Sequence, residues 1–264
     1  MHIQDIIKKI TDKILTHLNN GSLPWRKSWK SGIPINFITH RPYNGINFLS
    51  LLTNDYPSPY YLTFLQCQQR GGRINTGEKG HLIVYWSIKE ILDEEENLRQ
   101  VPIIRYSYVF NLSQTTLYED KTTSLKINTC EEIIRKASPV IKHNISQCYY
   151  NPKEDIISLP TIENFESKEE YYASLFHELI HWTGHQSRLN RKKTDYAYEE
   201  LIAEIGAAYL CGITQISNQT LANQSAYIEG WIKRIKNEPK VLLKAAAEAH
   251  KAVNYILNKQ EEET

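Results

Sequence analysis

The densest group of potential metal ligands in the chain is the segment SLFHELIHWTGHQSRLNR, residues 174–191, which holds three of the nine histidines. His177, Glu178 and His181 form an HExxH sequence without Gly or Pro, so the spacing predicts a helix. Residues four apart leave the same helix face about one turn apart, as two bonds of ~2.0–2.1 Å to one Zn²⁺ require. We therefore expect His177 and His181 to bind a metal. Glu178 is the expected catalytic base, which takes a proton from zinc-bound water.

The element that must position these residues begins upstream. Ser167, with Glu170 three residues later, is typical of a capping box at a helix start, and KEEYYASLFHELIHW follows without a helix breaker. The alternative, an amphipathic helix with two incidental histidines, fits less well because the apolar flanks, such as Leu179 and Trp182, favour a buried zinc helix.

The third ligand has two possible sources. An extended HExxHxxGxxH motif would place its glycine at Gly184, but Ser187 stands where the last histidine belongs. His185 lies out of register, and we expect a solvated turn histidine there. The other source is a glutamate from the following segment YAYEELIAEIGAAYLC, as in His₂Glu sites.

Two glutamates of that segment share one helix face. Glu200 and Glu204 are four apart, and we assign Glu200 as the metal ligand and Glu204 as the acceptor that orients a ligand histidine. The reversed assignment stays open, as does a structural alternative in which both pair with Arg188 or Arg191. Glu199 is expected to point into solvent.

Two histidines and one glutamate leave a fourth coordination position for water, which is typical of catalytic zinc. We expect one Zn²⁺ per chain, although Mn²⁺ or Co²⁺ could occupy a similar site. The expected reaction is hydrolysis of a peptide bond. Candidates for stabilising the oxyanion are Tyr198, Tyr209, Tyr227 and His250, and the sequence does not choose among them.

Charge is distributed unevenly in a chain whose formal net charge is only +1. Residues 1–89 hold 11 Lys and Arg against 4 Asp and Glu, so the basic charge lies in the N-terminal third. Aromatic residues interleave with these cations, an arrangement that suits phosphates and unstacked bases. The residues that we expect to bind single-stranded DNA are Trp25, Arg26, Trp29, Arg41, Tyr43, Asn44, Arg73 and Lys79.

Other features limit the compartment and the organisation. The four cysteines are scattered, as expected of reduced thiols, and no run of ~20 uncharged residues or signal peptide is visible. We expect a soluble, cytoplasmic protein without a membrane partner. Polar residues 115–126 are the expected linker between a domain at 1–114 and a second domain at 127–264.

Both halves resemble the ArdC family of plasmid antirestriction proteins. HELIHWTGHQSRLNR, YAYEELIAEIGAAYLC and AAAEAHKAVNYIL are similar to its zincin-like domain, and PWRKSW, RPYNGIN, YLTFLQCQQRGGRINTGEKG and YVFNLSQ to its N-terminal domain. The resemblance implies an α+β protein of two domains. The first is an α/β nucleic-acid-binding domain, and the second is a mostly helical, gluzincin-type metallopeptidase domain with a small sheet.

The resemblance also implies a function on mobile DNA. Family members bind single-stranded DNA and protect incoming plasmid DNA from host restriction, and by position His177, Glu178, His181 and Glu200 would be the metallopeptidase residues. The peptidase substrate would be an unknown protein or peptide, and a host restriction component is one candidate. A second hypothesis is a DNA-binding or decoy protein whose zinc domain is a non-proteolytic scaffold. A secreted digestive peptidase ranks last, because it would not explain the basic N-terminal third.

Overall fold

The computed structural model describes residues 3–29, 31–92, 98–119, 129–144, 146–192, 195–218 and 225–258. Helices and strands alternate in the first part, and helices dominate the second. The helices are α1 (Ile3–Asn19), α2 (Gly45–Leu52), α3 (Phe64–Gln69), α4 (Cys130–Ala137), α5 (Lys168–Thr183), α6 (Tyr196–Thr214), α7 (Ser225–Asn237) and α8 (Lys240–Ile256). The strands are β1 (Ile35–Asn36), β2 (Tyr60–Thr63), β3 (His81–Leu92), β4 (Leu98–Asn111), β5 (Val140–His143), β6 (Tyr149–Asn151) and β7 (Ile156–Leu159).

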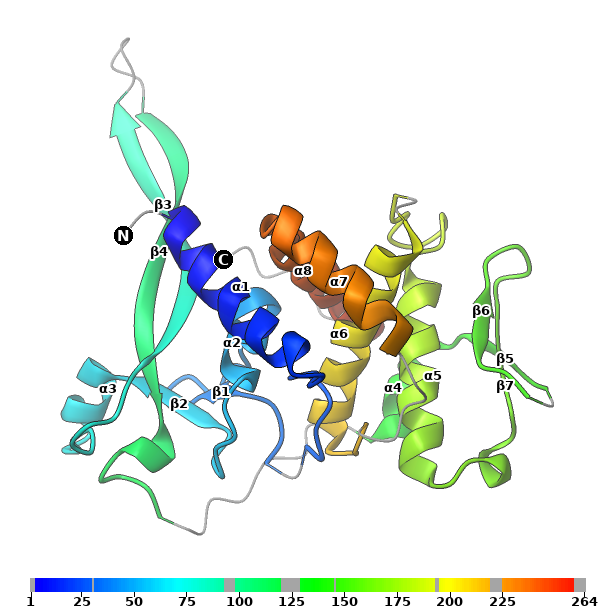
Figure 1. Cartoon of the computed structure of the whole chain (residues 1–264), viewed down its shortest axis with the longest axis horizontal. Coiled ribbons are helices and arrows are strands. Elements are labelled where there is room, and N and C mark those ends of the chain that lie inside the picture. The colour runs from blue at the N-terminus through cyan, green and yellow to red at the C-terminus, as the bar shows by residue number, and fades with distance from the viewer. Residues whose placement is uncertain are drawn as a thin grey trace.

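The first sheet belongs to the N-terminal part and has the strand order β1-β2-β4-β3. β1 pairs in parallel with β2, whereas β3 and β4 form a long antiparallel ribbon in which His81 faces Val109. β3 runs from His81 to Leu92 and β4 from Leu98 to Asn111. This ribbon extends away from the helices (Figure 1).

The second sheet is small and has the order β5-β7-β6. Its β6 and β7 form an antiparallel pair around Pro152–Asp155, in which Tyr150 pairs with Ile157. The helix that carries the HExxH sequence begins as predicted, with the Ser167 side chain accepting a hydrogen bond from the backbone N–H of Glu170. The Glu170 side chain caps the N–H of Glu166 instead of that of Ser167, so the box is half formed.

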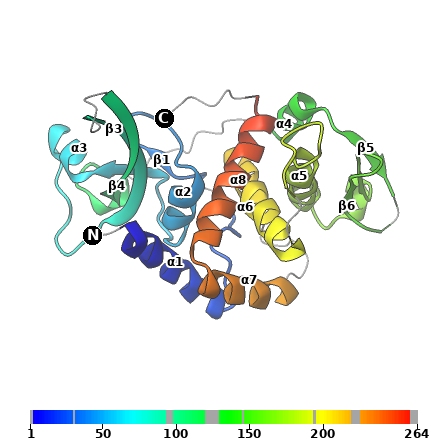
Figure 2. The same ribbon diagram turned by 90° about the horizontal axis from the view of Figure 1, so that it is seen from above.

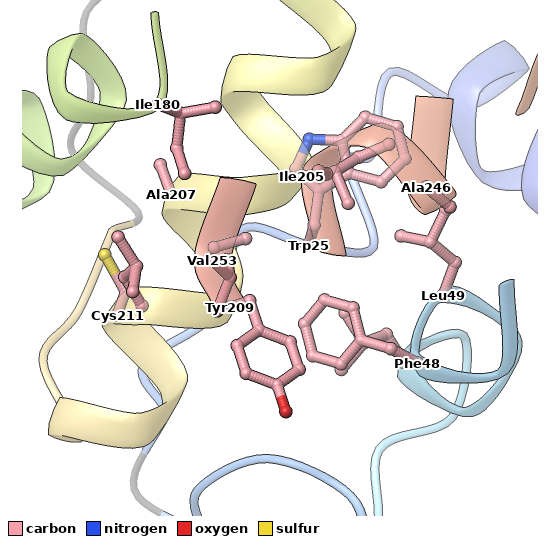
Figure 3. Packing of buried hydrophobic residues seen from close by; sticks show 14 of the residues in the cluster. Trp25, Phe48, Leu49, Ile180, Ile205, Ala207, Tyr209, Cys211, Ala246 and Val253 are labelled. Atoms are coloured by element: carbon pink, nitrogen blue, oxygen red, sulfur yellow. The ribbon is translucent and has the colours of Figure 1, made fainter. Parts of the chain in front are cut away.

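One hydrophobic core joins the two parts of the chain. Phe48 of α2 packs on Tyr209 of α6 with ring centroids 5.0 Å apart, and Trp25 packs edge-on against Trp231 of α7 at 6.1 Å. Figure 3 shows Trp25, Phe48 and Leu49 together with residues of α6 and α8. Figure 2 shows the helices between the two sheets, which lie at opposite ends.

These features confirm the α+β class with two sequence domains of different composition. The domain limits at residues 114 and 127 remain a prediction, and residues 120–126 of the expected linker lie outside the described ranges. The two domains are packed together over buried aromatic and aliphatic side chains, which the sequence did not predict. All four cysteines are free thiols, as expected.

Helices α5 and α6, which carry the HExxH sequence and the three glutamates, approach closely at a glycine. A Cβ atom built on Gly206 would lie 2.6 Å from Cδ1 of the fully buried Ile180. Real side chains do not tolerate this distance, so the two helices can pack at this separation because residue 206 has no side chain.

Gly206→Ala should therefore destabilise the protein by about 1–3 kcal/mol through overpacking, despite the better helix propensity of alanine. Gly230→Ala is the matched control, since a Cβ on this α7 glycine meets no atom within 4 Å. The control should gain about 0.5–1 kcal/mol. Thermal unfolding of the three proteins measures the difference, and a Gly206→Ala protein as stable as wild type would contradict the packing argument.

Candidate metal centre

The side chains of two histidines of α5 and one glutamate of α6 converge on one point. The Nε2 atoms of His177 and His181 are 3.2 Å apart. Glu200 completes a triangle, with one carboxylate oxygen 3.4 Å from Nε2 of His177 and the other 3.3 Å from Nε2 of His181. These three are the residues of the described chain whose ligand atoms could hold one metal ion together.

The size of this triangle fits a metal ion. Two ligands at ~2.0–2.1 Å in a tetrahedron lie about 3.3 Å apart, which is close to the 3.2 Å between the two Nε2 atoms and to the distance from each Nε2 to its nearer Glu200 oxygen. The donors are two imidazole nitrogens and a carboxylate oxygen, which are ligand types that Zn²⁺ and related divalent metals bind. The structure thus brings together the two histidines and the glutamate that were assigned as ligands from the sequence.

Each histidine also has a carboxylate at its other ring nitrogen. Nδ1 of His181 lies 3.2 Å from Oε1 of Glu199, and Nδ1 of His177 lies 3.6 Å from Oε1 of Glu204. Such acceptors fix the ring orientation and leave Nε2 free for the metal. The structure places Glu204 where we expected it, next to a ligand histidine.

The expectation for Glu199 is wrong. Its side chain is turned toward α5 and accepts hydrogen bonds from Arg191 at 2.6 and 3.1 Å, besides the contact with His181. Adjacent glutamates on a helix diverge by about 100°, which from the sequence alone predicts a solvated Glu199. The Arg191 side chain, which folds back from the loop after α5, pairs with Glu199 and leaves it only half-buried.

Among the described residues, Glu200 and Glu204 do not form the alternative ion pair with Arg188 or Arg191. Arg191 pairs with Glu199, whereas Arg188 pairs with Asp155 and stacks on the Trp182 ring at 3.9 Å. Glu200 is therefore left to face the two histidines. The two arginines instead fix the loop after α5 to its surroundings.

The three ligands lie in a cleft of roughly 1350 Å³ that extends to the small sheet. Glu178, which is 7% exposed, also lines this cleft. Its remaining walls come from β6 and from the loop between α5 and α6, and include Cys148, Tyr149, Tyr150, His185, Asn190, Lys192 and Tyr196. Burial raises the pKa of the Cys148 thiol to about 11, so this cysteine is a neutral thiol near pH 7.

The expected oxyanion candidates do not line this cleft where their side chains are described. Tyr209 packs on Phe48, and His250 lies beside Tyr209. Tyr198 lies under the Arg234 guanidinium, and the side chain of Tyr227 lies outside the described residues. His185, expected in solvent, is a cleft residue that accepts a hydrogen bond from the Ser187 amide. Tyr149 and Tyr150 line the cleft but were not predicted from the sequence. Only their place in a strand before the zinc helix could have indicated them.

Comparisons with known proteins agree with both parts of the chain. Residues 4–110 match the family model for the N-terminal domain of anti-restriction factor ArdC, and residues 128–248 match the zincin-like metallopeptidase model. The crystal structure of the metal-free antirestriction ArdC protein from plasmid R388 is 32% identical and superposes with a TM-score of 0.82, covering 97% of each chain. The chain belongs to the ArdC family.

The Mn(II)-bound structure of the R388 protein matches this ArdC-family chain with a TM-score of 0.79 at 32% identity, over 98% of this chain and 99% of the other. Together with the match to the zincin-like model, the Mn(II)-bound relative points to a divalent metal. The DNA primase TraC of Escherichia coli is 31% identical over 95% of this chain, which spans only 27% of the primase. Protein y4eC of Sinorhizobium fredii is 26% identical over 96% of this chain and 91% of its own length.

The indoles expected to bind DNA in this ArdC-family protein are buried. Trp25 is 0% exposed and Trp29 is 2% exposed, with Trp29 stacked on Phe48 at 5.9 Å. A base cannot stack on a ring whose faces are covered, so the assignment of Trp25 and Trp29 to single-stranded DNA is wrong. Arg26 is also corrected, because its guanidinium donates a hydrogen bond to the buried Glu204.

The other expected DNA residues remain accessible. Arg41, Asn44, Arg73 and Lys79 are exposed, whereas Tyr43 is half-buried and its hydroxyl accepts a hydrogen bond from Asn36 at 3.2 Å. Two further exposed rings, Tyr106 and Tyr108 of β4, were not predicted from the sequence and are 39% and 43% exposed. Separately, none of the described helices is long and apolar enough to cross a membrane.

Metal affinity should rise with pH in this ArdC-family protein. Burial lowers the pKa of His181, but hydrogen bonds to Glu199 and Glu200 raise it more, to about 9. Below that pH the metal-free ring carries a proton that a metal must displace, so affinity should increase up to about tenfold per pH unit and level off above about pH 9. Titration calorimetry with Mn²⁺ in buffers of different ionisation enthalpy should detect about one released proton at pH 7. A release that does not change in Glu199→Gln would contradict this cause.

Proposed function

We propose that this ArdC-family protein is a zinc-dependent peptidase that also binds single-stranded DNA and acts against restriction. The observation that carries the peptidase part is the position of Glu178. This carboxylate follows the first ligand histidine on α5 and opens into the same cleft as His177, His181 and Glu200. A base in that position can reach a water molecule that attacks a substrate bound in the cleft.

The residues of the site divide the hydrolysis among them. A divalent metal held by His177, His181 and Glu200 would act as a Lewis acid and lower the pKa of bound water. Glu178 takes the proton of the attacking water and passes it to the amine nitrogen as the peptide bond breaks. Glu199, which lies 3.2 Å from Nδ1 of His181, and Glu204, which lies 3.6 Å from Nδ1 of His177, would orient the imidazole rings for metal binding through Nε2.

The cleft suits a peptide chain better than a small molecule. Its volume of roughly 1350 Å³ exceeds the ~300–1,000 Å³ typical of pockets for small ligands. One wall is β6, which lies at the edge of its sheet. The expected substrate is a protein or peptide, with a host restriction component as the candidate in the cytoplasm that an incoming plasmid enters.

Glu178→Gln should lower the rate of peptide hydrolysis by about 10²–10⁴-fold, because the amide cannot accept the proton of the water. The metal should remain bound at one equivalent, since the three ligands are unchanged. Cleavage of a fluorogenic peptide mixture by the zinc-loaded protein measures the rate, and mass spectrometry measures the metal. Equal rates in wild type and Glu178→Gln would contradict the assigned base.

The same variant separates the peptidase from the alternative, a DNA-binding decoy with a non-proteolytic zinc scaffold. Plasmid transfer into a restricting host reports antirestriction directly. If proteolysis is the mechanism, Glu178→Gln loses protection of the plasmid. Full protection by this variant would instead assign antirestriction to DNA binding alone.

The proposed DNA-binding surface lies on the β3–β4 ribbon instead of the buried indoles. Tyr106 and Tyr108 alternate along β4 and so share one face, with ring centroids 6.3 Å apart. An exposed cation lies near them, because Lys79 precedes Gly80, which lies against Tyr108; Arg105 is also exposed but belongs to the opposite face of β4. Accessible rings beside cations are the features that single strands require, stacking platforms for bases and charges for phosphates.

Tyr106→Ala and Tyr108→Ala should each weaken binding of a single-stranded oligonucleotide by about 1–3 kcal/mol, the usual contribution of one stacked base. Tyr149→Ala is the matched control, because this tyrosine is equally exposed, at 45%, but lies on β6 in the other sheet. Fluorescence anisotropy at fixed salt concentration measures the affinity. If the Tyr149 variant loses as much affinity as the two β4 variants, the ribbon is not the binding surface.

A further inference from the structure

We propose that Trp25 and Arg26 are positioning residues of the metal centre, although they belong to the domain that matches the N-terminal ArdC model. Both donate to the carboxylate of Glu204. Trp25 Nε1 lies 3.2 Å from Oε2, and Arg26 Nη2 lies 3.4 Å from Oε1. The same Oε1 atom lies 3.6 Å from Nδ1 of His177, so a chain of polar contacts leads from the first domain to a metal ligand.

Burial makes these contacts consequential. The side chain of Glu204 is 1% exposed, and a carboxylate removed from water is costly without a cation or hydrogen-bond donors. Arg26, whose side chain is 15% exposed, supplies the charge, and Trp25 supplies a second donor. Together they donate to both oxygens of Glu204 and so fix the orientation of its carboxylate toward His177.

The segment that carries these two residues is itself fixed. Asn218, just after α6, donates from its amide to the carbonyl of Trp25 at 3.0 Å. Its Oδ1 atom accepts from the Lys27 amide and from Trp29 Nε1, each at 2.9 Å. The Trp25 ring lies beside Ile205 of α6, the residue after Glu204 (Figure 3). Trp25 and Arg26 therefore contact α6 from a held position.

This arrangement makes the metal centre a product of both domains. Glu204 orients His177 from the zincin-like domain, but the groups that orient Glu204 come from residues 25 and 26. Removing a group that orients a ligand histidine commonly weakens metal binding by about 10–100-fold. The inference rests on the metal site of the proposed function and does not depend on proteolysis.

The test is zinc affinity of the full chain, measured by competition with a chromogenic chelator. Arg26→Ala should weaken binding about 10–100-fold. Trp25→Phe, which keeps an aromatic ring but removes the Nε1 donor, should weaken it in the same direction. Lys27→Ala is the matched control, because Lys27 is the next cation of the segment, lines the same cavity as Arg26, and donates to Asn54 instead of Glu204. It should bind zinc as wild type does.

A double-mutant cycle separates positioning from a general loss of stability. If Arg26 acts through Glu204, then Arg26→Ala should change zinc affinity much less in a Glu204→Gln background than in wild type. Equal effects of Arg26→Ala in both backgrounds would overturn the proposal, as would wild-type affinity in both Arg26→Ala and Trp25→Phe. Glu200→Ala should abolish binding; if wild type itself binds no zinc, the metal site fails and this proposal fails with it.

Discussion

The contact between α5 and α6 at Gly206 and Ile180 is the constraint on which the metal centre depends. His177 and His181 flank Ile180 on one helix, and Glu200 lies less than two turns before Gly206 on the other. A larger residue at 206 would separate the helices, because a Cβ there would come within 2.6 Å of Ile180. The separations of 3.2–3.4 Å between the two Nε2 atoms and from each of them to an oxygen of Glu200 therefore depend on the absence of one side chain less than two turns away.

Charge compensation is the second requirement of the site. Four glutamates of α5 and α6 line one cleft, and such a concentration of carboxylates is unfavourable unless cations accompany it. Arg191 compensates Glu199 and Arg26 compensates Glu204, each from outside the two helices. Glu178 and Glu200 face the histidines and the cleft. A divalent cation bound there would balance the two carboxylates that no arginine contacts among the described residues.

Sequence patterns that act within one helix were predictable. The HExxH spacing and the four-residue spacing of Glu200 and Glu204 depend only on helix geometry, and the structure places these side chains as that geometry implies. The positions of Trp25, Trp29 and Glu199 could not be obtained in this way. Whether an indole is covered by Phe48, or a glutamate is turned toward Arg191, depends on residues distant in the sequence, which no local period encodes.

The sequence motifs separate into two domains, whereas the packing does not, because both parts share one core. The β3–β4 ribbon and the small sheet lie at opposite ends of the molecule, with helices between them (Figure 2). A nucleic acid on the ribbon would therefore leave the cleft beside β6 open, so both surfaces can be occupied at once. The shared core connects the parts of the chain that carry these two surfaces. Trp25 lies in that core and donates to Glu204, so it joins the packing of the first domain to the metal ligands of the second.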